Sequence, residues 1–370
     1  MSDQNFSRVI EKLLEKTVCG VPLAEKEIVL LLELNEAEEI SRVFQTARFL
    51  RDKNFGQKVF LYGFLYFSTF CRNDCRFCAS RISNSLARRY RKTQDEIIEA
   101  ACLLAESGVH LIDLTMGEDP LFYRDYAGFA PLTEMIHIIK KKTGLPIMVS
   151  PGVVPRNVLA QFKEAGADWF ACYQETHNRR LFDHLRPHQD YDTRLSLKAA
   201  AKSMGMLIEE GIMTGVGETS SDIAHSTQVM HDLAVHQARA MSFVPQAGTP
   251  MSGLLSPPRL RELLTIAVLR LLFPGLLIPA SLDVDGLDHV RERLNAGANV
   301  ITSLIPPQLG LSGVSQPILG IDDGFRTVQG VVSLVEEAGL GTASPEEYQQ
   351  WILSQKYGSS PESRICEVLA

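Results

Sequence analysis

The feature that most constrains the fold of this chain is a repeated unit in which a helical stretch is followed by a glycine and then by an apolar segment. One copy ends its helix at Glu106-Ser107-Gly108 and continues into the apolar run Val109–Thr115. The glycine recurs in the same place at Gly166, Gly205 and Gly297. Glycine is favoured just past a helix end, where the backbone turns left-handed. Helices that alternate with apolar strands in this way predict a parallel sheet.

Counting the apolar segments gives eight predicted strands. They are Val59–Phe67, Val109–Thr115, Pro146–Val149, Asp168–Tyr173, Met206–Met213, Ala238–Phe243, Leu277–Ala280 and Asn299–Thr302. The helices expected between them are Thr93–Ser107 behind a Thr93-x-x-Glu96 capping box, Ala130–Lys142, Arg156–Glu164, Thr193–Met204, Ser221–Leu233, Arg259–Phe273 and Leu287–Asn295. Eight such units predict a closed (β/α)8 TIM barrel over residues 57–306. A doubly wound open sheet is the alternative, because a strand count from pattern is uncertain by one or two.

Two extensions are expected to flank the barrel. Residues 1–56 form a helical extension, with one helix at Ala24–Leu34 and a second that follows an Asn35-x-x-Glu38 capping box and runs to about Arg51. Residues 307–370 form a C-terminal extension packed on the barrel, with helices at Gly324–Glu337 and Pro345–Gln355. We expect no second domain.

Composition excludes several classes of function. The net charge of -7 gives no basic footprint for nucleic acid. No apolar run is long enough to span a membrane, and the polar N-terminus does not resemble a signal peptide. The seven cysteines are an odd number and, outside one cluster, are scattered. We therefore expect a cytoplasmic protein with reduced thiols.

Three cysteines stand together directly after the first predicted strand, in the spacing C-x3-C-x2-C. They are Cys71, Cys75 and Cys78. Three thiolates on one loop can ligate three irons of a [4Fe–4S] cluster, and no further cysteine is near enough to fill the fourth iron. An open iron favours chemistry over electron storage. A structural zinc site is the alternative, but zinc needs four ligands and no second cysteine or histidine pair is present; Cys19, Cys102, Cys172 and Cys366 are isolated.

Polar residues follow several of the strands, at the end of the barrel where active sites are built. Gly117-Glu118-Asp119-Pro120 follows the second strand, and its backbone carbonyls could accept from an ammonium group; an ordinary turn is the alternative. Glu175 follows the fourth strand and Arg194 begins a later helix. This pair could bind a cofactor that carries an amino acid, or could be a surface ion pair. Gly211–Glu218, which includes Gly215, closes the fifth strand and would let backbone approach an adenine or ribose closely; a loop without a ligand is the alternative.

Charged residues also stand within or directly after the apolar strands. Asp113 lies in strand two, Arg239 in strand six, and Ser281 and Asp283 end strand seven. A buried charge is costly unless it is paired. Either Arg239 pairs with one of the aspartates to seal the barrel, or the set binds a small zwitterion, with arginine taking a carboxylate and the aspartates taking amines.

The cysteine run, with Phe77 before the last cysteine, resembles the C-x3-C-x-Φ-C signature of the radical S-adenosylmethionine enzymes. Gly117-Glu118 resembles the GGE-type motif of that family, and Gly211–Glu218 its G-x-I-x-G-x-x-E motif. Within the family, the chain looks like the branch of the biotin synthases and hydrogenase maturases. It is most similar there to the lysine mutases of pyrrolysine biosynthesis, in runs such as Asp113–Pro120 and Pro279–Asp283.

This resemblance implies a [4Fe–4S] cluster on Cys71, Cys75 and Cys78, whose open iron chelates S-adenosylmethionine. It implies that Phe77 packs near the adenine. It also implies a cofactor site made by Met116, Gly117, Glu118, Glu175, Arg194 and Gly215, in which the backbone of Met116, with Glu175 and Arg194, holds the methionine end. An electron from a flavodoxin- or ferredoxin-like donor would cleave the sulfonium to give a 5′-deoxyadenosyl radical.

The same resemblance implies the substrate, L-lysine. The radical would abstract a side-chain hydrogen, and the carbon skeleton would fragment and recombine as 3-methylornithine. Arg239 and Ser281 would hold the carboxylate, and Asp113 and Asp283 the amines. The cysteines of a second cluster are missing as a set, which disfavours biotin synthase. The alternatives are another enzyme of the same branch, such as the hydrogenase maturase HydE, and a non-catalytic iron–sulfur protein.

Two details of the cysteine region are less regular. Ala79-Ser80-Arg81 is small and polar where relatives are expected to have aromatic residues or cysteine. The basic run Arg88–Lys92 is expected to be a solvated loop that partly covers the cluster.

Overall fold

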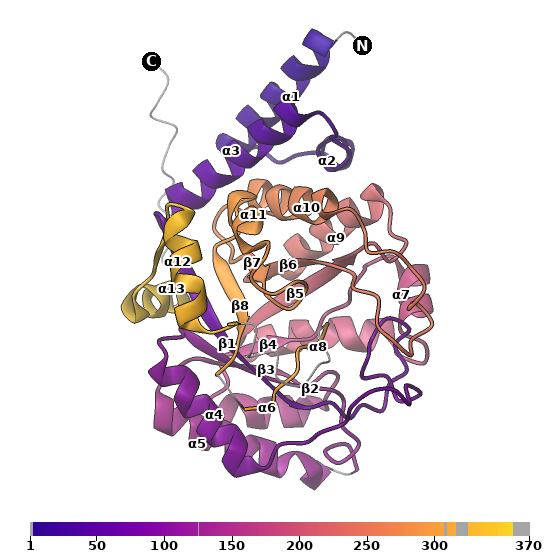
Figure 1. Ribbon diagram of the computed structural model, residues 1–370, viewed down its shortest axis with the longest axis vertical. Helices are drawn as coiled ribbons and strands as arrows, with labels where there is room; N and C mark the ends of the chain where they lie inside the picture. Colours follow the sequence, from indigo (N-terminus) through magenta and orange to yellow (C-terminus); the bar gives the residue numbers. More distant parts are fainter. Residues whose placement is uncertain (1–2, 125, 307–308, 316–324, 358–370) are drawn as a thin grey trace.

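The computed structural model describes residues 3–124, 126–306, 309–315 and 325–357 (Figure 1). Eight parallel strands form one sheet in the order β6-β5-β4-β3-β2-β1-β8-β7. Their bounds are β1 Lys58–Ser68, β2 Leu111–Met116, β3 Ile147–Ser150, β4 Trp169–Ala171, β5 Leu207–Thr214, β6 Gln237–Ser242, β7 Pro279–Ser281 and β8 Val300–Leu304. Every predicted strand is confirmed, with ends shifted by one or two residues.

The sheet curls into a nearly closed barrel, which confirms the predicted fold class. The two end strands, β6 and β7, are joined by a single parallel bridge between Gln237 and Leu277. A short ninth strand, β9 (Gly341–Thr342), pairs with the start of β1 and was not predicted. Two residues carry too little pattern to be recognised as a strand in a sequence.

Helices surround the strands. Their bounds are α1 Asp3–Val18, α2 Glu25–Leu32, α3 Ala37–Phe55, α4 Gln94–Glu106, α5 Ala130–Thr143, α6 Arg156–Glu164, α7 Arg179–Leu185, α8 Tyr191–Ser203, α9 Ser220–Leu233, α10 Arg259–Leu272, α11 Val290–Asn295, α12 Val328–Glu337 and α13 Pro345–Tyr357, with a 3-10 turn η1 at Tyr126–Phe129. The short α7 and η1 were not predicted. The expected start of α12 at Gly324 lies outside the described residues, as does Cys366.

The helix ends test the predicted caps. Thr93 accepts a hydrogen bond from the backbone of Glu96, which confirms that capping box. The box expected at Asn35 is wrong, because the N-cap of α3 is Glu36 and makes no side-chain cap bond. The four glycines that mark the repeated unit all have φ between 78° and 111°, so each helix ends in the left-handed turn that the sequence predicted.

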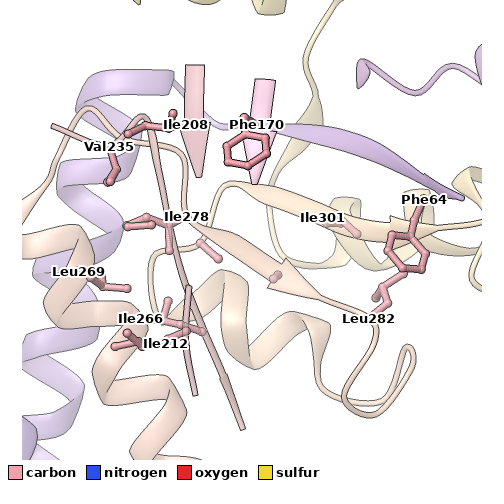
Figure 2. Packing of buried hydrophobic residues seen from close by; sticks show 14 of the residues in the cluster. Phe64, Phe170, Ile208, Ile212, Val235, Ile266, Leu269, Ile278, Leu282 and Ile301 are labelled. Atoms are coloured by element: carbon pink, nitrogen blue, oxygen red, sulfur yellow. The ribbon is translucent and has the colours of Figure 1, made fainter. Parts of the chain in front are cut away.

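The main core is the layer between the barrel wall and the outer helices. Figure 2 shows a part of it, in which Ile212 and Ile278 from the strand side and Ile266 and Leu269 from α10 point into the same layer. All four are at most 3% exposed. This layer fixes the wall of the barrel, and with it the positions of the strand ends.

The N-terminal helices lie at one end of the molecule (Figure 1), and α3 is in contact with α10. Arg51 of α3 is 3% exposed and donates to the carbonyl of Leu294 at 2.7 Å. The extension is thus tied to the barrel by a buried guanidinium. None of the described helices combines the length and the apolar content that a membrane crossing needs.

The C-terminal helix α13 covers the bottom of the barrel. The Tyr348 hydroxyl lies 2.6 Å from that of Tyr62, which comes from β1. Trp351 stacks on Trp169 of β4, with ring centroids 5.9 Å apart. These rings belong to a second apolar cluster inside the barrel. The bottom of the barrel is therefore filled by aromatic side chains.

We predict that Tyr348→Ala lowers the free energy of unfolding by about 3–5 kcal/mol, because it removes a buried ring and leaves a cavity. Urea unfolding followed by circular dichroism measures the change. The control is Leu353→Ala on the same helix. Leu353 is 45% exposed, so its replacement should change stability by about 0.5 kcal/mol or less. Equal effects of the two substitutions would contradict the role assigned to Tyr348.

Candidate active site

The cysteine loop leaves the top of β1 and presents three reduced thiols. The Cys75 sulfur accepts hydrogen bonds from Gln189 Nε2 at 3.0 Å and from Arg186 Nη1 at 3.4 Å. The Cys71 sulfur accepts from the backbone N–H of Asn73 at 3.4 Å. Donors aimed at sulfur stabilise thiolates, so the residues present suit an iron–sulfur cluster.

Burial acts against the charged form of these thiols. It raises the pKa of Cys71 to about 11, and it also raises the pKa of Cys78, which has Cys75 as a neighbour. Without metal, both thiols are therefore protonated near neutral pH. Among the described residues, no three cysteine, histidine or acidic side chains form a group that could hold a single metal ion. A [4Fe–4S] cluster with an open iron needs a different arrangement, in which each of three irons is bound by one thiolate.

The end of β2 packs directly against the cysteine loop. The Gly117 N–H donates to the carbonyl of Ser68 at 2.9 Å. A Cβ added at Gly117 would lie 2.3 Å from the carbonyl oxygen of Phe70 and 3.0 Å from the Cβ of Cys71. Only glycine fits at this position, so Gly117 sets how closely the loop approaches the barrel rim. Met116, which precedes it, is 5% exposed and is paired with Ser68 in the β1–β2 register.

The acidic turn after β2 is held by ion pairs. Glu118 is 5% exposed, and its Oε2 accepts from Arg72 Nε at 2.9 Å. The sequence indicated the carbonyls of Gly117 and Glu118 as possible acceptors for an ammonium group. In the structure they accept the N–H groups of Asp119 and Arg72. Arg194 Nη1 lies 3.7 Å from Glu118 Oε1, so Arg194 is the link from α8 to this turn.

Glu175 and Arg194 are both buried, and they do not pair with each other, so they are not the surface pair of the alternative interpretation. Glu175 accepts from Arg186 Nη2 at 2.6 Å and has a φ of 67°, which is rare for a residue with a side chain. Arg194 donates from Nε to the carbonyl of Tyr173 at 2.7 Å. Arg194 also donates from Nη1 to Gln189 Oε1 at 3.2 Å, so Glu175 and Arg194 each contact a residue that touches Cys75.

The glycine-rich loop after β5 is also fixed. Gly215 has a φ of 87°, and its N–H donates to Glu218, which pairs in turn with Arg261 at 2.6 Å. Val216 packs in one apolar cluster with Phe77 and Cys75. The loop therefore faces the cysteine loop, as a cofactor held between the two would require.

One cavity opens at this end of the barrel, with about 890 Å³ of space including its mouth. Seven of the residues singled out in the sequence line it: Phe77, Cys78, Asp113, Glu175, Arg239, Ser281 and Asp283. Cys71, Cys75, Met116, Gly117, Glu118, Arg194 and Gly215 do not line it. They lie in the loops beside it.

The charged residues of the cavity do not neutralise one another. Arg239 pairs with Glu209 of β5, Nε to Oε1 at 2.6 Å, and with neither Asp113 nor Asp283. Of the two alternatives, pairing of Arg239 with one of these aspartates is therefore wrong, and its internal partner is Glu209 instead. Asp113 accepts from the hydroxyl of Ser150 at 2.8 Å, and burial raises the pKa of its carboxyl to about 7.

Ser281 of β7 and Asp283, two residues after it, also line the cavity. Asp283 accepts the N–H of Ser315 at 2.8 Å and lies 3.5 Å from Arg326 Nη2. The Ser281 hydroxyl oxygen accepts the N–H of Asp283 at 3.3 Å, so its O–H is available as a donor. The cavity wall thus contains a guanidinium, a hydroxyl and two carboxylates.

Sequence reasoning missed two residues in contact with this site. Arg186 touches Cys75 and Glu175, and its guanidinium carbon lies 5.2 Å from the centre of the Phe77 ring. It follows α7, which no sequence pattern indicated. Glu209 lies in an apolar strand, and the argument that singled out Asp113 applied equally to it.

In the basic run Arg88–Lys92, Arg88 and Arg91 are exposed and the other three residues are half-buried. Arg89 donates to the carbonyls of Thr69, Ser80 and Arg81. Arg91 pairs with Asp119, Nε to Oδ2 at 2.6 Å. These arginines connect the return of the cysteine loop to the barrel rim, so the run is a structural brace rather than a free loop.

Comparisons with known proteins identify the family. Residues 65–229 match the model of the radical SAM superfamily. The 3-methylornithine synthase of Methanosarcina barkeri is 40% identical over 92% of this chain and 96% of its own, and that of Methanosarcina acetivorans is 39% identical over 94% and 97%. The [FeFe] hydrogenase maturase subunit HydE of Thermotoga maritima is 31% identical over 73% and 77%.

Solved structures give the same result. The crystal structure of methylornithine synthase (PylB) matches with a TM-score of 0.86 at 40% identity, over 92% of this chain and 99% of that one. A hydrogenase maturase, HydG, shares the fold with a TM-score of 0.77 at 18% identity, over 95% and 80%. The chain therefore belongs to the radical S-adenosylmethionine superfamily and, within it, to the family of the 3-methylornithine synthases.

Proposed function

We propose that this protein converts L-lysine to 3-methylornithine in the cytoplasm, as a step of pyrrolysine biosynthesis. The observation that supports this most directly is the shared cavity. Phe77 and Cys78 of the cysteine loop line it together with Arg239, Asp113 and Asp283. A cofactor on the cluster and a small zwitterion would therefore meet in one enclosed space.

The proposed cofactors are a [4Fe–4S] cluster on Cys71, Cys75 and Cys78, and S-adenosylmethionine on its open iron. When bound and reduced by a flavodoxin- or ferredoxin-like donor, they supply a hydrogen-abstracting radical. Phe77 would pack on the adenine and Gly215 would let the backbone approach the nucleoside. The turn Met116-Gly117-Glu118, with Glu175 and Arg194, would hold the methionine end.

The chain's own residues would orient the substrate. Arg239 and Ser281 would donate to the lysine carboxylate, and Asp113 and Asp283 would accept from its two amines. Lysine has charges at both ends, so these side chains would fix both ends and hold its carbon chain in one extended position. The aromatic bottom of the barrel excludes water from below, which matters for a rearrangement whose fragments must recombine before they escape.

We predict that the reconstituted protein, reduced with dithionite under anaerobic conditions, converts lysine to an isomer of unchanged mass and releases 5′-deoxyadenosine from S-adenosylmethionine. Mass spectrometry reads both products. Cys75→Ser should lose the cluster and both products. A protein that holds the cluster but makes no 5′-deoxyadenosine would instead be a non-catalytic iron–sulfur protein. One that makes 5′-deoxyadenosine but no lysine isomer would belong with the other enzymes of the branch.

Asp283→Asn tests the amine site. The amide keeps an oxygen for the Ser315 N–H but loses the negative charge, so the isomer should fall by roughly 100-fold while the iron content is unchanged. Asp288→Ala, five residues further along the chain at an exposed position, is the control and should behave as wild type. Loss of the cluster in Asp283→Asn would assign this residue a structural role.

The pKa of Asp113 predicts a pH dependence. Its carboxyl has a pKa of about 7 in the folded protein, raised by burial from 3.8, so it is largely neutral below pH 7 and cannot pair with an ammonium group. We expect kcat/KM for lysine to rise with pH through about 7 and then level off. Asp113→Asn should lower activity and remove this rise. A flat profile in the wild type would contradict the assignment.

A further inference from the structure

Glu209 is a fully buried carboxylate on the inner face of β5, and it is bonded to Arg239 and Tyr173, which line the cavity. Its exposed fraction is 0%, and both of its oxygens are used. Oε1 accepts from Arg239 Nε at 2.6 Å, and Oε2 accepts from the Tyr173 hydroxyl at 2.8 Å. The next residue, Glu210, faces the other way and pairs with Lys198 of α8 at 2.5 Å. Successive residues of a strand point to opposite faces, so only the first of these two acids can serve the cavity.

The guanidinium of Arg239 is held on two of its three nitrogens. Nε is bound by Glu209, and Nη1 donates to Thr302 Oγ1 of β8 at 3.0 Å. The group also lies over the Tyr173 ring, 5.6 Å from its centre. Within the described part of the chain, Nη2 makes no hydrogen bond, and Arg239 lines the cavity. The edge that carries Nη2 is therefore the one left for a ligand.

The neighbouring anions show why this restraint matters. Asp113 and Arg239 affect each other's pKa, so they are within electrostatic reach, yet they form no ion pair within the described residues. A buried guanidinium without a partner is strongly drawn to the nearest anion. Without Glu209, that anion would be Asp113, and the arginine and the aspartate would neutralise each other instead of binding a ligand.

We infer that Glu209 is a positioning residue, which holds Arg239 apart from Asp113 so that the guanidinium reads the carboxylate of the substrate while the aspartate reads an amine. The inference rests on the proposed function, because it assumes an amino-acid substrate. Glu209 itself does not touch the cavity. By pairing with Arg239, it prevents Arg239 and Asp113 from neutralising each other. The two side chains can then bind the two oppositely charged groups of one zwitterion.

The experiment compares lysine with 1,5-diaminopentane, the same molecule without the carboxylate. Isothermal titration of the reconstituted enzyme with S-adenosylmethionine measures both dissociation constants. The wild type should prefer lysine. In Glu209→Gln this preference should fall by about tenfold or more, the order expected when a charge-assisted hydrogen bond no longer fixes the guanidinium. Binding of the diamine, which needs only the aspartates, should change less.

Glu210→Gln is the matched control, because it is the adjacent residue of the same strand, is equally buried and also loses a paired charge. It should reduce thermal stability but keep the preference for lysine. Tyr173→Phe removes only the hydroxyl that holds Glu209 Oε2, and should lower the preference between about twofold and tenfold. If Glu209→Gln fails to fold, Tyr173→Phe still tests the role of Glu209.

The outcomes separate the two proposals. If wild type does not prefer lysine over the diamine, the amino-acid substrate and the role of Glu209 both fail. If wild type prefers lysine and the folded Glu209→Gln variant keeps that preference, only the positioning role is overturned. If Glu209→Gln does not fold, an unchanged preference in Tyr173→Phe overturns it. A preference lost in Glu209→Gln and kept in Glu210→Gln supports it.

Discussion

The cost of burying charge is the constraint on which this structure depends. An uncompensated charge inside a barrel wall would be destabilising by several kcal/mol, so each one needs a partner. Strand β5 carries two adjacent acids, and the alternation of the strand sends them to opposite sides. Glu210 anchors α8 through Lys198, and Glu209 fixes Arg239 inside. One strand thereby joins the outer scaffold to the inner recognition groups.

The cysteine loop depends on a second constraint, which is close packing at the rim. Gly117 leaves no space between the end of β2 and Phe70, and Arg186 joins Cys75 to Glu175. The loop is therefore held from two directions by elements that come far apart in the sequence. Two of the residues proposed to bind the cofactor, Gly117 and Glu175, therefore also help to position the cysteine loop.

The sequence predicted the parts of the molecule that follow local rules. The eight strands were recognisable because buried parallel strands are short apolar runs, and the left-handed glycines marked the helix ends. Strand β9, helix α7 and Arg186 were missed because tertiary contacts, not local pattern, create them. Arg239 lines the cavity, but its ion-pair partner could not be chosen from the sequence: Glu209 and Asp113 lie on strands of the same barrel and Asp283 follows a third strand, and only the folded structure decides which is nearest.

The seam of the barrel has a consequence for how it moves. Strands β6 and β7 meet at one bridge near the bottom, and above it they carry Arg239 and Ser281 without a continuous ladder. The barrel is thus open between β6 and β7, on the side where the carboxylate of the substrate is proposed to bind. Local opening costs least where the fewest backbone bonds are broken. An anion bound by residues of both strands would join them across this gap. Binding of the anion and the rigidity of the barrel are therefore thermodynamically linked.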